Sequence, residues 1–198
     1  KKTMFKKENK PLYLSFIFQG TRISLDGVVW PLILFIAIPS LTKIGGLTTI
    51  TLLVSLLVIN LVSKHINKFR WSVFSLGNLG RNLVWAVRGI VPIPLLIAVT
   101  DPIYQLSSIF VTLPRNLLIY RKGRNERLNF FTQRELCVHL GRFLGLALTL
   151  LGLLAGLSWQ IAALIAVWST TLASLFIYQY SQQSKGIISK FKAKIGRL

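Results

Sequence analysis

Acidic residues are scarce in this chain, and so are the residue types that build most catalytic and metal sites. Five of its 198 residues are aspartate or glutamate, its two histidines lie far apart, and its one cysteine, Cys137, cannot form an internal disulfide. The sequence has no nucleophile beside a base, no glycine-rich phosphate loop and no acid and histidine set with metal-ligand spacing. We therefore expect no enzyme, no metal site and no cofactor, and expect Cys137 to serve packing.

Positive charge is abundant by contrast, with 24 lysines and arginines and a formal net charge of +19. Such a balance suits nucleic-acid binding, anionic lipids or the cytoplasmic loops of a membrane protein. Most of these charges lie in short clusters between apolar runs, and no nucleic-acid motif is present. With 53% hydrophobic residues and a mean hydropathy of +0.59, the chain is expected to be an integral membrane protein whose partners are membrane lipids and not nucleic acid.

Six apolar stretches are long enough to cross a bilayer as helices. Basic connections alternate with nearly uncharged ones along the chain, which places both termini and the basic connections in the cytoplasm. We expect an all-α, multi-pass protein of the plasma (inner) membrane with six transmembrane helices. Its predicted parts are a basic cytoplasmic leader at 1–10, a six-helix bundle at 11–180 that divides into three-helix inverted repeats at 11–89 and 91–178, and a basic amphipathic cytoplasmic tail at 181–198.

The first span carries polar residues along one helical face. Ser15, Gln19, Arg22, Asp26 and Trp30 recur at steps of 4, 3, 4 and 4. A charge near mid-bilayer costs roughly 2.5 to 3.5 kcal/mol, so this face must meet protein or water. Arg22 and Asp26 can pair within the helix. Either the pair only neutralises itself, or Arg22 meets an anionic group of a substrate while Asp26 sets the charge of the site or carries a coupling proton.

The fourth span repeats this pattern, with Asp101, Gln105, Ser108, Thr112 and Arg115 at steps of 4, 3, 4 and 3. Asp101 precedes Pro102, so it has the alternative role of occupying a kink near the outer end of its helix. Otherwise we expect both stripes to face one central space. The predicted substrate or ion cavity is lined by Gln19, Arg22, Asp26, Trp30, Asp101, Gln105, Ser108 and Thr112.

Other features of the spans point to contacts between helices. Asn78, Arg81 and Asn82 of the third span are expected to bond neighbouring helices. In the fifth span two pairs of small residues allow close helix contact, namely Gly141 with Gly145 and Gly152 with Gly156.

Three features resemble one family of transporters. The segment LVSKHINKFRW at 61–71 is similar to a cytoplasmic loop signature between the second and third helices of a transporter half, with Ser63, His65 and Asn67 in place of the signature's glycine, leucine and aspartate and with basic Lys68 and Arg70 kept. The segment RELCVHLGRFLGLAL at 134–148 is similar to the opening of an eleventh helix, and each three-helix unit begins with a polar-striped helix. Together these features resemble the C-terminal six-helix half of a major facilitator superfamily transporter.

The resemblance implies half of a secondary active transporter that moves a small-molecule substrate by alternating access. Its partner would be an N-terminal six-helix half in the same native chain or a second copy. An alternative from another class is a small polytopic membrane scaffold or assembly protein without transport activity, whose polar stripes bind a partner. A cytoplasmic gate is expected from the loop residues Lys64, Asn67, Lys68 and Arg70 and from Glu135, His139 and Arg142 of the fifth span, although packing against loop charges would also explain the last three.

Overall fold

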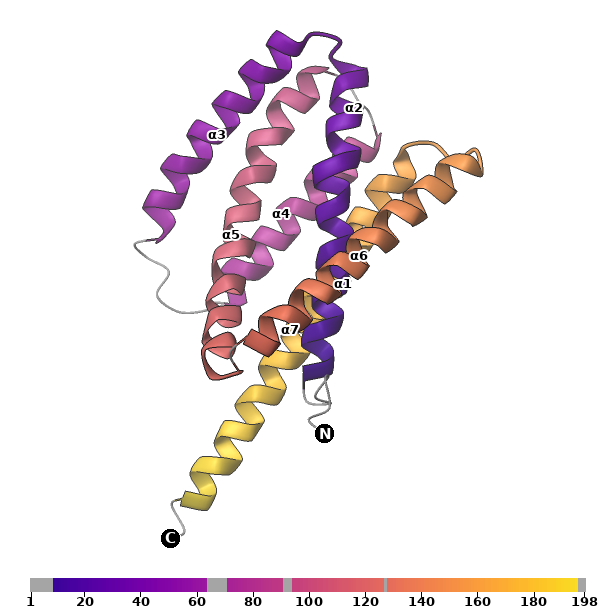
Figure 1. The fold of residues 1–198 in the computed structure, drawn as a ribbon. Coiled ribbons are helices and arrows are strands. Elements are labelled where there is room, and N and C mark those ends of the chain that lie inside the picture. The colour runs from indigo at the N-terminus through magenta and orange to yellow at the C-terminus, as the bar shows by residue number, and fades with distance from the viewer. Residues whose placement is uncertain (1–8, 64–70, 91–93, 127, 196–198) are drawn as a thin grey trace.

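The computed structural model describes residues 9–63, 71–90, 94–126 and 128–195, and its elements are helices (Figure 1). The first three form one continuous rod, which we call the first rod: α1 (Lys10–Ser24), the π-helical turn η2 (Leu25–Val29) and α2 (Trp30–Ala37). The longer helices that follow are α3 (Leu41–Ser63), α4 (Trp71–Ile90), α5 (Pro94–Glu126), α6 (Leu128–Leu154) and α7 (Gln160–Ile195).

Four of these helices are long and apolar enough to cross a membrane, namely Lys10–Ala37, Leu41–Asn60, Asn129–Leu154 and Gln160–Gln182. This confirms the expectation of an all-helical membrane protein. Over the described residues α4 and α5 are not among these four; α4 carries Arg81 within its length and α5 carries Asp101. Both of these side chains are buried within the bundle.

The rods pack as two groups that are joined through α4 and α7. The helix α1 packs mainly against α6 and α7, whereas α5 packs mainly against α4 and α3. Successive rods run in opposite directions, so the start of α1 and the end of α7 lie at the same end of the molecule (Figure 1). The helix α7 runs without a break to Ile195, so the predicted tail begins as its continuation and not as a separate helix.

Glycines bring α1 and α6 into close contact. A Cβ atom added to Gly20 would lie 2.0 Å from the carbonyl oxygen of Val138, and one added to Gly141 would lie 1.9 Å from that of Ile17. Thr21 Oγ1 donates a hydrogen bond to the carbonyl oxygen of Gly141 at 3.0 Å across the same contact. The backbones therefore approach as closely as small residues allow.

The second predicted glycine pair is only half right. A Cβ on Gly152 would meet Ile161 of α7 at 2.8 Å, which agrees with a helix contact. Gly156 lies after the end of α6 at a φ of +76°, and nothing lies within 4 Å of a Cβ placed there. Gly156 therefore ends the helix in the left-handed conformation that glycine tolerates best, and it makes no helix contact.

The π turn in the first rod has a local cause. Pro31 lacks a backbone N–H, and its ring would clash with the carbonyl of residue 27 in a regular α-helix. Instead the backbone N–H of Trp30 bonds the carbonyl oxygen of Leu25, and the wider turn accommodates the proline without a break. The turn contains Asp26 and begins three residues after Arg22, so it positions the charged part of the predicted polar stripe.

Candidate functional site

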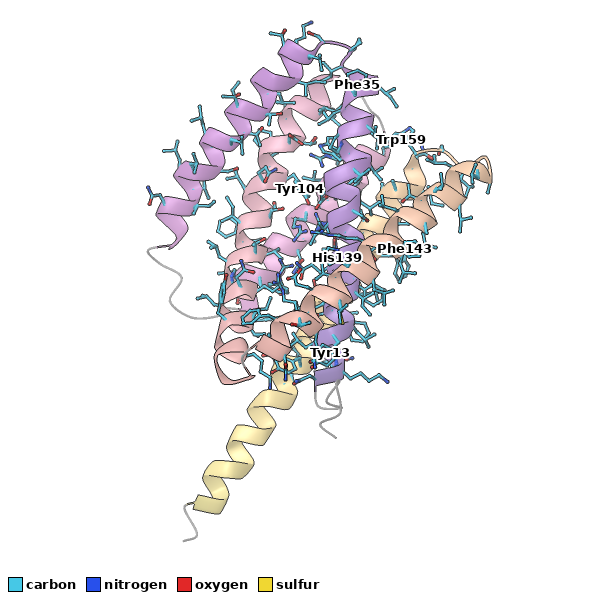
Figure 2. All side chains as sticks on the ribbon, in the orientation of Figure 1. Tyr13, Phe35, Tyr104, His139, Phe143 and Trp159 are labelled. Carbon is cyan, nitrogen blue, oxygen red and sulfur yellow. The ribbon has the colours of Figure 1, made fainter. Side chains whose placement is uncertain are left out.

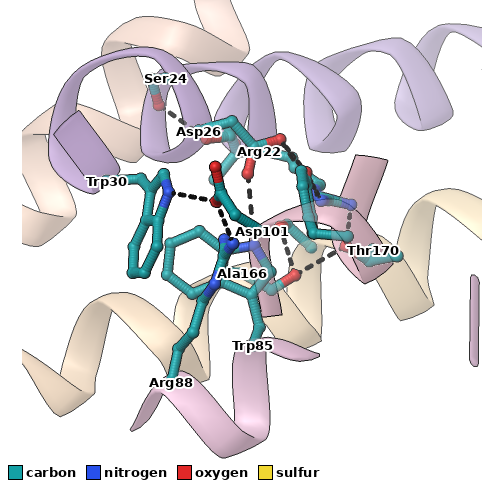
Figure 3. Close-up of polar contacts among 12 residues, drawn as sticks. Arg22, Ser24, Asp26, Trp30, Trp85, Arg88, Asp101, Ala166 and Thr170 are labelled. Carbon is teal, nitrogen blue, oxygen red and sulfur yellow. Dashed lines mark hydrogen bonds and ion pairs between the residues drawn. The ribbon is translucent and has the colours of Figure 1, made fainter. Parts of the chain in front are cut away.

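Charged and aromatic side chains from four rods meet inside the bundle, and we call this set the central cluster (Figure 3). Its charged members are two arginine and aspartate pairs, one within the first rod and one between α4 and α5. Figure 2 shows Tyr104 directed into the bundle, whereas Phe143 of α6 points outward and is 70% exposed. The members are Arg22, Asp26, Trp30, Trp85, Arg88, Asp101, Tyr104 and Thr170.

Arg22 is held by three partners from three helices. Its Nη1 donates to Thr170 Oγ1 of α7 at 2.9 Å, and its Nη2 donates to the hydroxyl of Tyr104 of α5. Its Nη2 also lies 3.3 Å from Asp26 Oδ2, so the predicted pairing of Arg22 with Asp26 is confirmed. The Tyr104 hydroxyl in turn donates to Asp26 Oδ2 and so bridges the two charges.

The two carboxylates have parallel surroundings. Asp26 accepts a hydrogen bond from Trp85 Nε1 of α4 at 3.2 Å, and Asp101 accepts one from Trp30 Nε1 of the first rod at 2.9 Å. Asp101 also accepts from Arg88 Nη2 at 2.5 Å. Each carboxylate is therefore paired with one arginine and accepts a hydrogen bond from one indole.

Aromatic rings cover the arginines of the central cluster. The guanidinium carbon of Arg88 lies 3.5 Å from the centroid of the Trp30 ring and 4.8 Å from that of Tyr104. The guanidinium carbon of Arg22 lies 5.1 Å from the Tyr104 centroid. These distances suit cation–π attraction, which is strongest where water is excluded.

A small cavity of about 20 Å³ lies next to the central cluster, and we call it the arginine cavity. Three arginines from α1, α4 and α5 line it, together with amide and hydroxyl groups. Its polar lining residues are Gln19, Arg22, Asn78, Arg81, Arg115, Thr170 and Ser174.

A larger groove of about 780 Å³ runs along the outside between α4 and α7, and we call it the α4–α7 groove. Asn78 and Ser174 line both the groove and the arginine cavity, so they separate one from the other. In the same groove Asn82 donates a hydrogen bond to Thr171 Oγ1 of α7 at 3.1 Å, as expected for a bond between neighbouring helices. Asn78 bonds the backbone oxygen of Phe74 in its own helix instead.

Half of the predicted cavity residues meet in one place. Arg22, Asp26, Trp30 and Asp101 join in the central cluster, and Gln19 lines the adjoining arginine cavity. Gln105, Ser108 and Thr112 are half-buried on α5 and do not take part in the bonds of the cluster. The position on α5 that does take part is Tyr104.

The predicted cytoplasmic gate stays a prediction. Its loop residues Lys64, Asn67, Lys68 and Arg70 lie outside the described residues. On α6, Glu135 forms an ion pair with its neighbour Arg134 at 2.8 Å, and His139 is exposed. In the described part of α6, no hydrogen bond or ion pair joins Glu135, His139 and Arg142 to one another.

Sequence reasoning missed Tyr104, Trp85, Arg88 and Thr170 as members of the cluster. Arg88 lies near the end of α4, next to a connection with little charge, and Tyr104 and Trp85 do not stand out in apolar spans. One signal was available: Tyr104 lies three residues after Asp101, on the same helical face.

Comparisons with known proteins give no relative: no family model, no curated protein and no solved structure matches this chain. The fold and the cluster define the class as an all-helical membrane protein with ion pairs inside its helix bundle.

Proposed function

We propose that this chain is one half of a secondary active transporter that moves a small solute by alternating access. The observation that carries the proposal is the central cluster, in which two arginine and aspartate pairs lie where the two groups of helices meet, with both arginines and Asp101 buried and Asp26 half-buried. Ionisable residues inside membrane helices are costly, and they commonly mark solute, ion or proton pathways. Transporter sites also tend to lie at the interface between repeats.

In this proposal all six rods cross the membrane as two three-helix inverted repeats at 11–89 and 91–178. The packing pairs support the repeats. In the two repeats the first rod corresponds to α5, α3 corresponds to α6, and α4 corresponds to α7. The contact of α1 with α6 therefore has its counterpart in the contact of α5 with α3. The contact of α1 with α7 likewise has its counterpart in the contact of α5 with α4, and the contact of α4 with α7 is its own counterpart. The charges of α4 and α5 are compatible with spanning because Arg81, Arg88 and Asp101 are buried.

The solute path would lie on the half-buried side of α5 and the first rod. Asp26 keeps 27% of its side chain exposed, and Gln105, Ser108 and Thr112 are half-buried on α5. A six-helix half supplies only one wall of a central cavity. The opposite wall would come from an N-terminal half in the same native chain or from a second copy, as in the major facilitator superfamily that the sequence resembles.

One observation favours the scaffold alternative. The α4–α7 groove opens on the outside of the bundle and carries polar residues, including Ser75, Asn82 and Gln182, where a helix facing lipid would present apolar ones. A partner helix with polar residues would fill such a groove. A scaffold of this kind has no need of a path that opens to both sides of the membrane.

Cysteine labelling tests alternating access without knowledge of the solute. In the native polypeptide with Cys137→Ser, a Gln105→Cys substitution places one thiol on α5. A membrane-impermeant maleimide should modify it in right-side-out vesicles and also in inside-out vesicles, because the site opens to each side in turn. The matched control is Leu151→Cys, whose native side chain is 62% exposed on α6 and is expected to face lipid; it should react in neither.

Reaction of Gln105→Cys from one side only, or from neither side, would contradict the transporter proposal. That result together with co-purification of a second protein, lost on Asn82→Leu in the α4–α7 groove, would support the scaffold instead.

A further inference from the structure

The arginine cavity collects more positive charge than the protein neutralises. Arg22 of α1, Arg81 of α4 and Arg115 of α5 line it, and no carboxylate does so among its lining residues. Arg22 is paired with Asp26, and the nearby Arg88 is paired with Asp101. Among the described residues neither Arg81 nor Arg115 forms an ion pair with a carboxylate. Within the described part of the chain, two arginines of this cavity therefore lack a carboxylate in ion-pair contact.

Donor groups around the cavity also lack acceptors. The Nε atoms of Arg22, Arg81 and Arg115 are buried and have no hydrogen-bond partner within the described residues. The side-chain oxygen of Gln19 is buried and unbonded as well, and rotation of this amide would present its NH₂ group in the same direction. Arg22 and Arg81 are 2% and 8% exposed, and Arg115 is half-buried. Because the three Nε atoms themselves are buried, bulk water does not satisfy them. Buried donors without acceptors are costly.

We propose that the arginine cavity binds an oxyanion group of the phosphate type, held by Arg81 and Arg115 with support from Arg22 and Gln19. Such a group supplies several acceptor oxygens and up to two negative charges, which matches the two unpaired arginines. Planar guanidinium groups bind phosphate and carboxylate oxygens through paired N–H donors, and three of them converge here from three helices.

The size of the cavity indicates how the group enters. A volume of about 20 Å³ holds about one water molecule, so an oxyanion needs more room. Asn78 and Ser174 form the boundary with the α4–α7 groove, and rotation of their side chains into the groove would enlarge the cavity on that side. The groove also presents apolar Leu79 and Leu175, so it can admit either a soluble anion or the headgroup of an anionic lipid.

This inference rests on the proposed function in one respect, because it makes the oxyanion the charged group of the transported solute. Binding itself can be measured without transport. The purified native polypeptide in detergent is titrated with inorganic phosphate against chloride at equal ionic strength, and thermal unfolding is followed by tryptophan fluorescence. In a parallel arm, native mass spectrometry measures retention of phosphatidic acid against phosphatidylcholine.

Four variants test the site, and their expected effects on the affinity for the oxyanion differ. Arg81→Gln and Arg115→Gln should each weaken binding about tenfold or more, because each removes a charged donor. Asp26→Asn should strengthen it, because it removes the carboxylate that competes for Arg22. Lys43→Gln removes one positive charge, as the two arginine variants do, but at an exposed position of α3, and it should leave binding unchanged. A variant that merely misfolds could not produce the gain expected of Asp26→Asn.

Saturable stabilisation by phosphate that is weakened in Arg81→Gln and Arg115→Gln, strengthened in Asp26→Asn and unchanged in Lys43→Gln identifies a soluble oxyanion. Selective retention of phosphatidic acid with the same differences among the variants, together with no stabilisation by inorganic phosphate, identifies a lipid headgroup. Absence of binding in both arms, or equal binding by wild type, Arg81→Gln and Arg115→Gln, overturns the site. Two-sided labelling of Gln105→Cys alongside such a negative result would leave the transporter proposal standing, so the two failures are distinguishable.

Discussion

Arg88 of α4 and Asp101 of α5 form a buried ion pair across the connection between their helices, with 2.5 Å between Nη2 and Oδ1. Their side chains are 1% and 13% exposed. Trp30 of the first rod donates to the same carboxylate oxygen and lays its ring against the same guanidinium group. This pair therefore holds the first rod against both helices.

Breaking the pair from one side should destabilise the protein strongly. Asp101→Asn leaves the charge of Arg88 buried without a partner, and the expected loss in the free energy of unfolding is about 3–5 kcal/mol. The double variant Arg88→Met with Asp101→Leu removes both charges and should recover most of that loss. Thermal unfolding in detergent, monitored by tryptophan fluorescence, measures the stability of the single and the double variants. A double variant as unstable as the sum of its two single variants would contradict this account.

The Tyr104 hydroxyl should contribute to stability through both of its bonds. Tyr104→Phe removes an acceptor for Arg22 and a donor for Asp26 but keeps the ring that covers Arg22. We expect the free energy of unfolding to fall by about 1–3 kcal/mol, because buried charged groups lose partners. Tyr120→Phe is the matched control, since Tyr120 is 66% exposed. Equal stability of the two variants would show that the bridge contributes nothing.

Helical spacing was sufficient to predict contacts within one rod. It placed Gln19, Arg22, Asp26 and Trp30 on one face, and the structure buries Gln19, Arg22 and Trp30 against neighbouring helices with Asp26 at the edge. Residues at i and i+4 are neighbours in any helix, so the pairing of Arg22 with Asp26 depends little on the rest of the fold. Contacts between rods have no such local rule.

The fourth span shows where spacing fails. Ser107 of α5 is buried against α4, where a Cβ on Gly80 would lie 2.4 Å from Ser107 Oγ, whereas Ser108 is half-buried. With Ser107 in this place, Asp101 and Tyr104 of the same helix face the cluster while Gln105 is half-buried. Which face of a polar helix points inward depends on the helix packed against it, and one sequence does not reveal which helix that neighbour is.

Close packing of α1 on α6 should make Gly141 intolerant of even a methyl group. Gly141→Ala would place its Cβ 1.9 Å from the carbonyl oxygen of Ile17, which is backbone and can move only if the helices separate. We expect a loss of about 1–3 kcal/mol or more in the free energy of unfolding. Gly45→Ala on α3 meets nothing within 4 Å and should be neutral or slightly stabilising. Thermal unfolding of the two variants side by side makes the comparison, and a loss no greater for Gly141→Ala than for Gly45→Ala would argue against the contact.

The crossing of the membrane by α4 and α5 can be decided at Ile90, the last residue of α4, which is 72% exposed. In a six-span protein with cytoplasmic termini this end of α4 lies outside, whereas in a protein with only the four most apolar spans it lies inside. We expect Ile90→Cys, in the Cys137→Ser background, to react with an impermeant maleimide in right-side-out vesicles. Ser158→Cys should react from outside and Lys122→Cys from inside under either topology, so they verify vesicle orientation.

Reaction of Ile90→Cys only in inside-out vesicles would reduce the spans to four. It would also place the ion pair of Arg88 and Asp101 outside the membrane interior and remove the main support for a solute path through it.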